Sequence, residues 1–183
     1  MTVSLEPLLN LYRQRAGDRY GGEPVSQLEH ALQTAALAAA AQAPPPLIIA
    51  SLLHDVGHLL LPAAVTEANS SQDTNHEDWG ARYLSRYFGP AVTEPVRLHV
   101  AAKRYLCTVD PVYGASLSTA SQQSLVLQGG PFTVAAAQAF ITQPYGAMAV
   151  QLRRWDEQAK RPDWPTPSLE SWQPLLRAWA IAP

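Results

Sequence analysis

Residues 46–60 read PLIIASLLHDVGHLL, and this stretch decides the fold. The segment from Leu47 to about His58 is apolar nearly all round, which predicts a helix buried at the centre of the molecule. Such a helix offers few partners for polar side chains, yet it carries the adjacent pair His54 and Asp55. An unpaired carboxylate in the interior is strongly destabilising or loses its charge. A metal ion removes that penalty, so the pair indicates a metal site.

The spacing within this helix suggests how His54 and Asp55 would bind metal ions. Neighbouring helix residues point about 100° apart, so His54 can bind one metal ion while the two oxygens of Asp55 reach between two ions. His58 lies four residues after His54, on the same face, where it can hydrogen-bond a bound ligand or Asp55. We therefore expect Asp55 to bridge two metals and His58 to act as an acid–base group rather than as a ligand.

Helices are also expected on both sides of this stretch. Alanine-rich segments with apolar spacings of three and four alternate with Pro and Gly clusters. Ser26 and Glu29 have the form of a capping box that opens a helix, which ends before residues 44–46, all proline. The fold class is therefore all-α. The other expected helices cover residues 4–16, 76–88, 93–106, 118–127 and 144–160, with chain reversals at residues 110–111 and 129–131.

The length and composition fit one globular domain. The chain has 183 residues, of which 47% are hydrophobic, enough for a sizeable core. We expect a single domain over residues 1–183, in which the proline- and tryptophan-rich tail, residues 164–183, packs across the surface before a short last helix.

The composition also limits the function. A single cysteine, Cys107, excludes a disulfide framework and a thiolate-rich zinc site, so any metal is held by nitrogen and oxygen. The net charge is -2 and no basic cluster is longer than Arg153-Arg154, which argues against a nucleic-acid partner. No apolar run is long enough to span a membrane, and the charged first residues do not fit a signal peptide. We expect a cytoplasmic enzyme with a small substrate and no membrane partner.

All the histidines lie in or beside expected helices. One such histidine would usually be structural, but four further ligand-type residues, each on a separate amphipathic helix, can converge on the central one. Four neutral imidazoles and two carboxylates suit iron, manganese or zinc, and ligand type does not choose among these metals. The candidate metal ligands are His30, His54, Asp55, His76, His99 and Asp156.

In chain order, these six residues form the ligand pattern of the HD-domain superfamily in its two-metal form. That superfamily includes phosphodiesterases as well as mixed-valent di-iron oxygenases related to inositol oxygenase. Residues outside the ligand set resemble the PhnZ-like oxygenases, which cleave a carbon–phosphorus bond. The similarity covers roughly Leu5 to Asp163. The segments that carry it are DRYGGEPVSQLEHALQ (18–33), SLLHDVGH (51–58), HVAAKRYL (99–106), SLSTASQQSLVLQGGPF (116–132) and RRWDEQAK (153–160).

The resemblance implies a single HD-domain helical bundle with a dinuclear iron site at its centre. His30, His54, Asp55 and Asp156 would bind one iron. Asp55, His76 and His99 would bind the other, with Asp55 as the bridge. His58 matches a histidine beside the bridging aspartate.

The resemblance also implies roles in substrate binding. Tyr20 would occupy the open iron position before substrate enters, and Glu23 would recognise a substrate amine. Lys103, one turn after His99, and Arg153, three residues before Asp156, would hold the phosphonate. Two further polar residues of the pocket are expected to be Ser121 and Gln128.

The reaction implied for this family converts 2-amino-1-hydroxyethylphosphonate and dioxygen to glycine and phosphate, and a close relative uses the trimethylammonium analogue. We therefore expect an oxygenase with two iron ions, Fe(II)/Fe(III), dioxygen as co-substrate and a small phosphonate as substrate. The leading alternative is a phosphohydrolase in which two metals activate water against a phosphate ester. A non-catalytic metal-binding module is a third possibility, less favoured because a structural site would close every coordination position.

Overall fold

The computed structural model describes residues 3–18, 22–61 and 73–181. Within these ranges every regular element is a helix, which confirms the all-α class. The helices are α1 (Glu6–Arg15), α2 (Gln27–Ala40), α3 (Pro45–Leu53), α4 (Val56–Leu60), α6 (His76–Leu84), α7 (Pro90–Val109), α8 (Pro111–Ser116), α9 (Thr119–Leu127), α10 (Val134–Thr142), α11 (Gly146–Gln158), the 3₁₀ helix η1 (Leu169–Trp172) and α12 (Gln173–Trp179).

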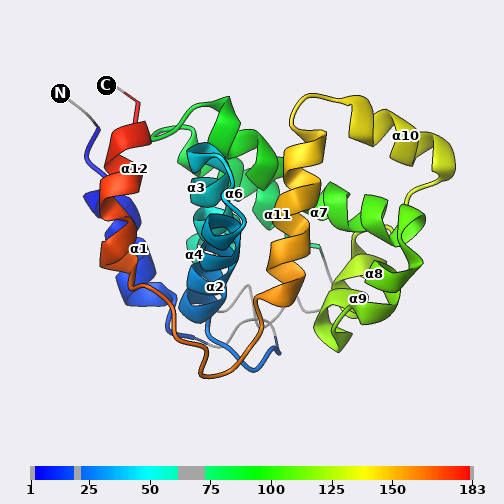
Figure 1. Cartoon of the computed structure of the whole chain (residues 1–183), viewed down its shortest axis with the longest axis horizontal. Coiled ribbons are helices and arrows are strands. Elements are labelled where there is room, and N and C mark those ends of the chain that lie inside the picture. The colour runs from blue at the N-terminus through cyan, green and yellow to red at the C-terminus, as the bar shows by residue number, and fades with distance from the viewer. Residues whose placement is uncertain (1–2, 19–21, 62–72, 182–183) are drawn as a thin grey trace.

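The helices divide into two ends and a centre (Figure 1). Helices α1 and α12 lie at one end, and α8, α9 and α10 lie at the other. The long helix α7 connects the two parts, because it packs along α11, α6 and α3 as well as against α8 and α10. The centre, formed by α2, α3, α7 and α11, is where the candidate ligands were expected to meet.

The central helix is buried as predicted, but it is not continuous. Helix α3 ends at Leu53, and α4 begins at Val56 after Asp55 leaves the helical conformation (φ -98°, ψ 12°). The backbone N–H of His58 then bonds to the carbonyl of Asp55 at 3.0 Å, three residues back instead of four. The prediction of one helix over residues 47–58 is therefore wrong. The direction of the Asp55 side chain is set by this break and not by regular helical spacing.

Close packing of two helices accompanies the break. Gly57 on α4 lies against the backbone of His76 on α6, and a β-carbon at Gly57 would overlap the His76 carbonyl oxygen. A β-carbon at Gly80 would lie 3.2 Å from the backbone nitrogen of Gly57. Two glycines thus allow α4 and α6 to touch through their backbones, and this contact fixes the position of His76.

The capping box predicted at the start of α2 is present. Ser26 Oγ accepts a hydrogen bond from the Glu29 N–H at 3.1 Å, and the Glu29 carboxylate accepts one from the Ser26 N–H at 2.7 Å. These bonds also lower the pKa of Glu29. Because Ser26 follows Glu23 by three residues, the cap fixes the end of the loop that carries Glu23.

Two short helices were not predicted. The chain-reversal signal at Asp110 begins α8, where the Asp110 side chain accepts a hydrogen bond from the Tyr113 N–H at 3.1 Å. Thr133 caps α10 in the same way, through the Ala136 N–H at 3.2 Å. The predicted reversals at residues 110–111 and 129–131 were therefore incomplete, because each leads into a capped helix.

The tail contributes to the core as well as covering it. Leu169, Trp172 and Leu176 are buried in the same hydrophobic cluster as α1, α2 and α3, and α12 contacts α3. The short last helix was predicted, but its share of the core was not. Among the described residues, no helix is long and apolar enough to cross a membrane.

We predict that Gly57→Ala destabilises the fold by about 1–3 kcal/mol, because the new methyl group forces α4 away from the His76 backbone. The free energy of unfolding by urea measures the effect. Gly114→Ala is the matched control, because its β-carbon would lie 3.9 Å from the nearest atom, an ordinary contact within a helix. Equal stability of the two variants would show that the α4–α6 contact is not tight.

Candidate active site

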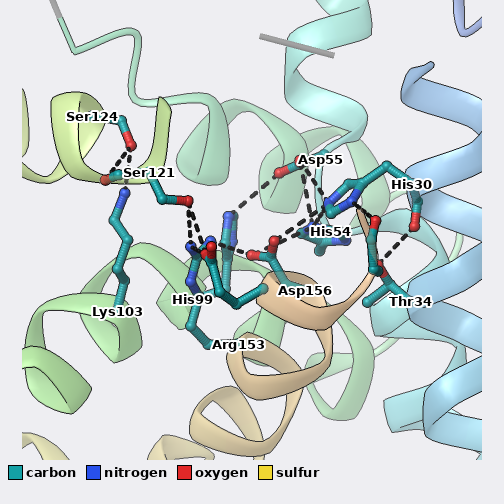
Figure 2. A network of polar contacts seen from close by, with 12 residues as sticks. His30, Thr34, His54, Asp55, His99, Lys103, Ser121, Ser124, Arg153 and Asp156 are labelled. Atoms are coloured by element: carbon teal, nitrogen blue, oxygen red, sulfur yellow. Dashed lines mark hydrogen bonds and ion pairs between the residues drawn. The ribbon is translucent and has the colours of Figure 1, made fainter. Parts of the chain in front are cut away.

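The structure brings the six predicted ligands into one buried cluster, and Figure 2 labels all of them except His76. His30 comes from α2, and His54 and Asp55 come from the break between α3 and α4. His76 is the first residue of α6, while α7 and α11 contribute one residue each. These last two are His99 and Asp156.

Asp55 lies between two pairs of imidazoles. Its Oδ2 is 3.6 Å from Nε2 of His30 and 3.4 Å from Nε2 of His54. Its Oδ1 is 3.4 Å from Nε2 of His76 and also 3.4 Å from Nε2 of His99. One carboxylate oxygen therefore faces each pair, which is the geometry that a bridge between two cations requires. Each pair with its Asp55 oxygen keeps its ligand atoms within 4.8 Å of one another.

The first pair of imidazoles has its lone pairs directed at one centre. Nδ1 of His30 lies 2.8 Å from the carbonyl oxygen of Ala159, and Nδ1 of His54 lies 2.9 Å from that of Ser51. A carbonyl oxygen only accepts, so both Nδ1 atoms carry a proton, and in the neutral imidazoles both Nε2 atoms have lone pairs. These two Nε2 atoms are 3.2 Å apart. Two facing lone pairs repel unless a cation lies between them.

The second pair has the same geometry. Nδ1 of His99 donates to the carbonyl oxygen of Val96 at 2.6 Å, so Nε2 of the neutral ring is an acceptor. That atom lies 3.2 Å from Nε2 of His76. Burial lowers the pKa of His76 to about 3 and, in the first pair, that of His54 to about 4. Both imidazoles are therefore neutral at neutral pH, which is the form that binds metals.

The two carboxylates add negative charge to the cluster. Burial alone would raise the pKa of Asp55, but the neighbouring His54, His76 and His99 keep it well below its usual range. For Asp156, Arg153 and the neighbouring histidines have the same effect. Oδ2 of Asp55 and Oδ1 of Asp156 accept no hydrogen bond from the described residues, and the latter lies 3.3 Å from His30 Nε2. Buried anionic oxygens and inward lone pairs fit two metal cations.

His58 lies beside this cluster but not where its spacing suggested. Because the central helix is broken, His58 does not continue the face of His54. Its ring stacks on that of His76, with 3.9 Å between centroids and 18° between planes. His58 is half-buried, and burial lowers its pKa. It therefore supports a candidate ligand from the side, and its acid–base role stays a prediction.

Arg153 joins the cluster to a second polar region. Its Nη1 bonds directly to Asp156, and its Nε donates to the Tyr113 hydroxyl at 2.8 Å. Its Nη2 donates to Ser121 Oγ at 3.2 Å and to Glu157 Oε2 at 2.7 Å. The guanidinium is buried, with only 5% of its side chain exposed. A strong cation is thus fixed next to a candidate metal ligand (Figure 2).

Lys103 is a second buried cation, on α7. Its Nζ donates to Ser124 Oγ at 2.7 Å. Burial lowers the pKa of Lys103 to about 7, and the charge of Arg153 contributes in the same direction. Lys103 and Arg153 thus destabilise each other's charge, and an anion between them would relieve the repulsion.

The other predicted pocket residues differ in their placement. Ser121 is buried and contacts Arg153. Gln128 ends α9, and its buried Oε1 accepts no hydrogen bond from the described residues, so no contact joins it to this network. Glu23 is buried, and its carboxylate lies 3.0 Å from Lys160 Nζ and also accepts from the Ser118 hydroxyl. Tyr20 lies outside the described residues.

Five residues of this network were not predicted from the sequence: Tyr113, Ser118, Ser124, Glu157 and Lys160. Glu157 and Lys160 follow Arg153 by four and seven residues, so helical spacing could have placed them on its face. Tyr113 and Ser118 carried no such signal, because α8 was not predicted and a contact with a distant helix leaves no local pattern.

Comparison with known proteins gives this geometry a context. Residues 28–121 match the HD domain family. A hydroxymethylphosphonate dioxygenase of Gimesia maris is 46% identical over 160 residues, which cover 87% of this chain and 80% of that protein. A glycine-betaine-forming 1-hydroxy-2-(trimethylamino)ethyl phosphonate dioxygenase of Leisingera caerulea is 38% identical over 167 residues, covering 91% and 85%.

We predict that Asp55→Ala loses both metal ions, since one carboxylate faces both imidazole pairs, whereas Asp156→Ala loses only the ion beside His30 and His54. Metal content by elemental analysis after iron loading measures this. Glu94→Ala, which removes an acid paired with Arg97 on the surface of α7, is the control and should bind as wild type. Full metal content in Asp55→Ala would refute the bridge.

Proposed function

The chain belongs to the HD-domain family, and from that premise we propose that it is a metal-dependent oxygenase that uses dioxygen to cleave the carbon–phosphorus bond of a small hydroxyphosphonate. Two relatives, both named as phosphonate dioxygenases, support this activity over the whole region of similarity. The observation that carries the proposal is the direct contact of buried Arg153 with Asp156, because it fixes a cation for the phosphonate beside a candidate metal ligand.

Lys103 and Arg153 would bind the phosphonate. They lie on facing helices, α7 and α11, and both are buried, so an anion between them is shielded from water and attracted by two fixed charges. Because Asp156 contacts Arg153 and also lies 3.3 Å from His30 Nε2, a phosphonate held by Arg153 would lie beside the imidazole cluster. The residues thus bind and orient the substrate in a dry site, which is the main contribution that a protein makes to such chemistry.

Iron is the metal we propose for the cluster. Imidazole and carboxylate ligands suit iron, manganese and zinc alike, but zinc has no redox chemistry to offer dioxygen. When bound, two iron ions would supply the redox chemistry that activates dioxygen. The proposed ligands are those of the sequence analysis, His30, His54, Asp55 and Asp156 for one ion and Asp55, His76 and His99 for the other.

Two alternatives are considered for the group attached to the hydroxyl-bearing carbon of the substrate. The sequence analysis predicts an amine that Glu23 recognises, with glycine or a methylated glycine as product, and the Leisingera caerulea relative is named for a trimethylamino substrate. The Gimesia maris relative is named for hydroxymethylphosphonate, which has no amine. The gating role of Tyr20 and the cytoplasmic location stay predictions.

We predict that the iron-loaded protein releases phosphate from hydroxymethylphosphonate or 2-amino-1-hydroxyethylphosphonate in air but not under argon. The reaction needs dioxygen as the oxidant, and phosphate is measured colorimetrically. Asp55→Ala serves as the inactive control. Phosphate release that continues under argon would show cleavage without dioxygen and contradict the oxygenase.

We predict that Lys103→Ala lowers kcat/KM for the phosphonate by about ten- to a hundredfold, because a charge-assisted hydrogen bond is lost. Its metal content should stay at the wild-type level. Arg97→Ala on the same helix, which removes an exposed cation, should keep full activity. Wild-type efficiency in Lys103→Ala would place the phosphonate elsewhere.

The lowered pKa of Lys103 predicts a pH dependence. Lys103 attracts the phosphonate only when protonated, and burial lowers its pKa to about 7. In wild type, kcat/KM should therefore fall as the pH rises through neutrality. Lys103→Met removes the titrating group. The ratio of wild-type to variant kcat/KM should therefore fall over the same pH range. A ratio that stays constant with pH would show that another group causes the fall.

A further inference from the structure

Glu77 is a largely buried acid beside the candidate metal centre, and it is not one of the predicted ligands. It is the second residue of α6, directly after His76, and its side chain is only 12% exposed. Its Oε2 accepts no hydrogen bond from the described residues. Nδ1 of His76 lies within ion-pair distance of this oxygen, at 3.5 Å. A buried carboxylate oxygen without a donor is unfavourable, so its position next to a candidate ligand needs a reason.

The four imidazoles of the cluster differ on the side that faces away from Asp55. Nδ1 of His30, His54 and His99 lies between 2.6 and 2.9 Å from a backbone carbonyl oxygen. Within the described part of the chain, Nδ1 of His76 has no such carbonyl, and the oxygen that faces it belongs to the Glu77 side chain. One imidazole of the four therefore has a carboxylate where the others have a peptide group.

Packing alone does not decide which nitrogen of His76 carries the proton. The backbone of His76 is fixed by Gly57, and its ring is stacked on that of His58. Neither contact distinguishes Nδ1 from Nε2. A carboxylate only accepts, so Glu77 favours the proton on Nδ1. The lone pair of Nε2 is then directed toward Asp55 Oδ1, 3.4 Å away.

The two halves of the cluster also differ in negative charge. The first half has Asp156 in addition to its oxygen of Asp55. The second half, with His76 and His99, has only the other oxygen of Asp55. Glu77 adds a second acid on this side. Burial raises the pKa of Glu77, and a cation bound at the far nitrogen of the same imidazole would offset the cost of its charge.

We propose that Glu77 is a positioning residue for the metal ion of the second half, a role that rests on the proposed function only for the presence of metal in the cluster. Glu77 acts through His76. It keeps the Nε2 lone pair directed at the ion, and its charge makes the imidazole a stronger ligand. Carboxylates that bond the outer nitrogen of a ligand histidine have this effect in metal sites, and their loss typically weakens metal affinity by about ten- to a hundredfold.

The test measures the affinity of each ferrous ion under argon, by competition with a chelator. Glu77→Ala should weaken one of the two ions by about ten- to a hundredfold and leave the other at its wild-type affinity. Glu77→Gln keeps an oxygen that can accept from Nδ1 but removes the charge, so its loss should be smaller. Asp78→Ala is the matched control, because it removes the neighbouring exposed acid, and both ions should bind as in wild type.

The background of His76→Ala separates this role from direct ligation and from a structural role. If Glu77 acts through His76, Glu77→Ala should weaken metal binding no further once the imidazole is gone. The metal-free Glu77→Ala protein should also unfold in urea at the wild-type concentration or above it, because a buried acid without a donor is removed.

Wild-type affinity for both ions in Glu77→Ala would overturn the proposal. So would an undiminished loss in the His76→Ala background, or metal-free Glu77→Ala that unfolds at a lower urea concentration than wild type. These measurements involve no turnover, so they are independent of the reaction. The expected affinities in a protein that releases no phosphate in air would support the role of Glu77 and contradict the oxygenase.

Discussion

The rest of the structure depends on one constraint. Two carboxylates are buried among imidazoles whose lone pairs face one another. Nε2 of His30 and Nε2 of His54 lie 3.2 Å apart, each protonated on its far nitrogen, and Asp55 presents one oxygen to this pair and the other to the second pair. Such an arrangement is unfavourable unless cations occupy it. The residues of this cluster come from separate helices, so the helices must pack closely where each contributes a ligand. The break at Asp55 and the contact of Gly57 with His76 provide this packing.

The same constraint extends outward into substrate binding. Asp156 has Arg153 on one side and the imidazole cluster on the other. Arg153 and Lys160 both contact Glu157 and Ser121. Lys160 also contacts Glu23. A continuous set of charge-assisted hydrogen bonds therefore connects the candidate metal centre to the loop that would meet the substrate's substituent. A change in one charge therefore alters the electrostatic environment of the next, from the candidate metal ligands to Glu23.

Much of this arrangement could be predicted from sequence because it leaves local or ordered signals. The buried helix, the capping box of Ser26 and Glu29 and the order of His and Asp residues are all readable along the chain. The break at Asp55 was not, since an apolar run gives no sign that Gly57 must approach another backbone. The pairing of Lys160 with Glu23 joins residues far apart in sequence, so neither residue's neighbours reveal it. Gln128 is the opposite case. The resemblance placed it in the pocket, but its buried Oε1 accepts no hydrogen bond from the described residues.

The proposed reaction inserts oxygen from dioxygen as phosphate is released. A hydroxyphosphonate and dioxygen together contain the atoms of a carboxylic acid and phosphate, with one new oxygen in each product. Turnover under isotopically labelled dioxygen in ordinary water, followed by mass spectrometry of both products, tests this directly. One labelled oxygen atom is expected in the acid and one in the phosphate. Unlabelled products, whose new oxygen atoms come from water, would contradict this reaction.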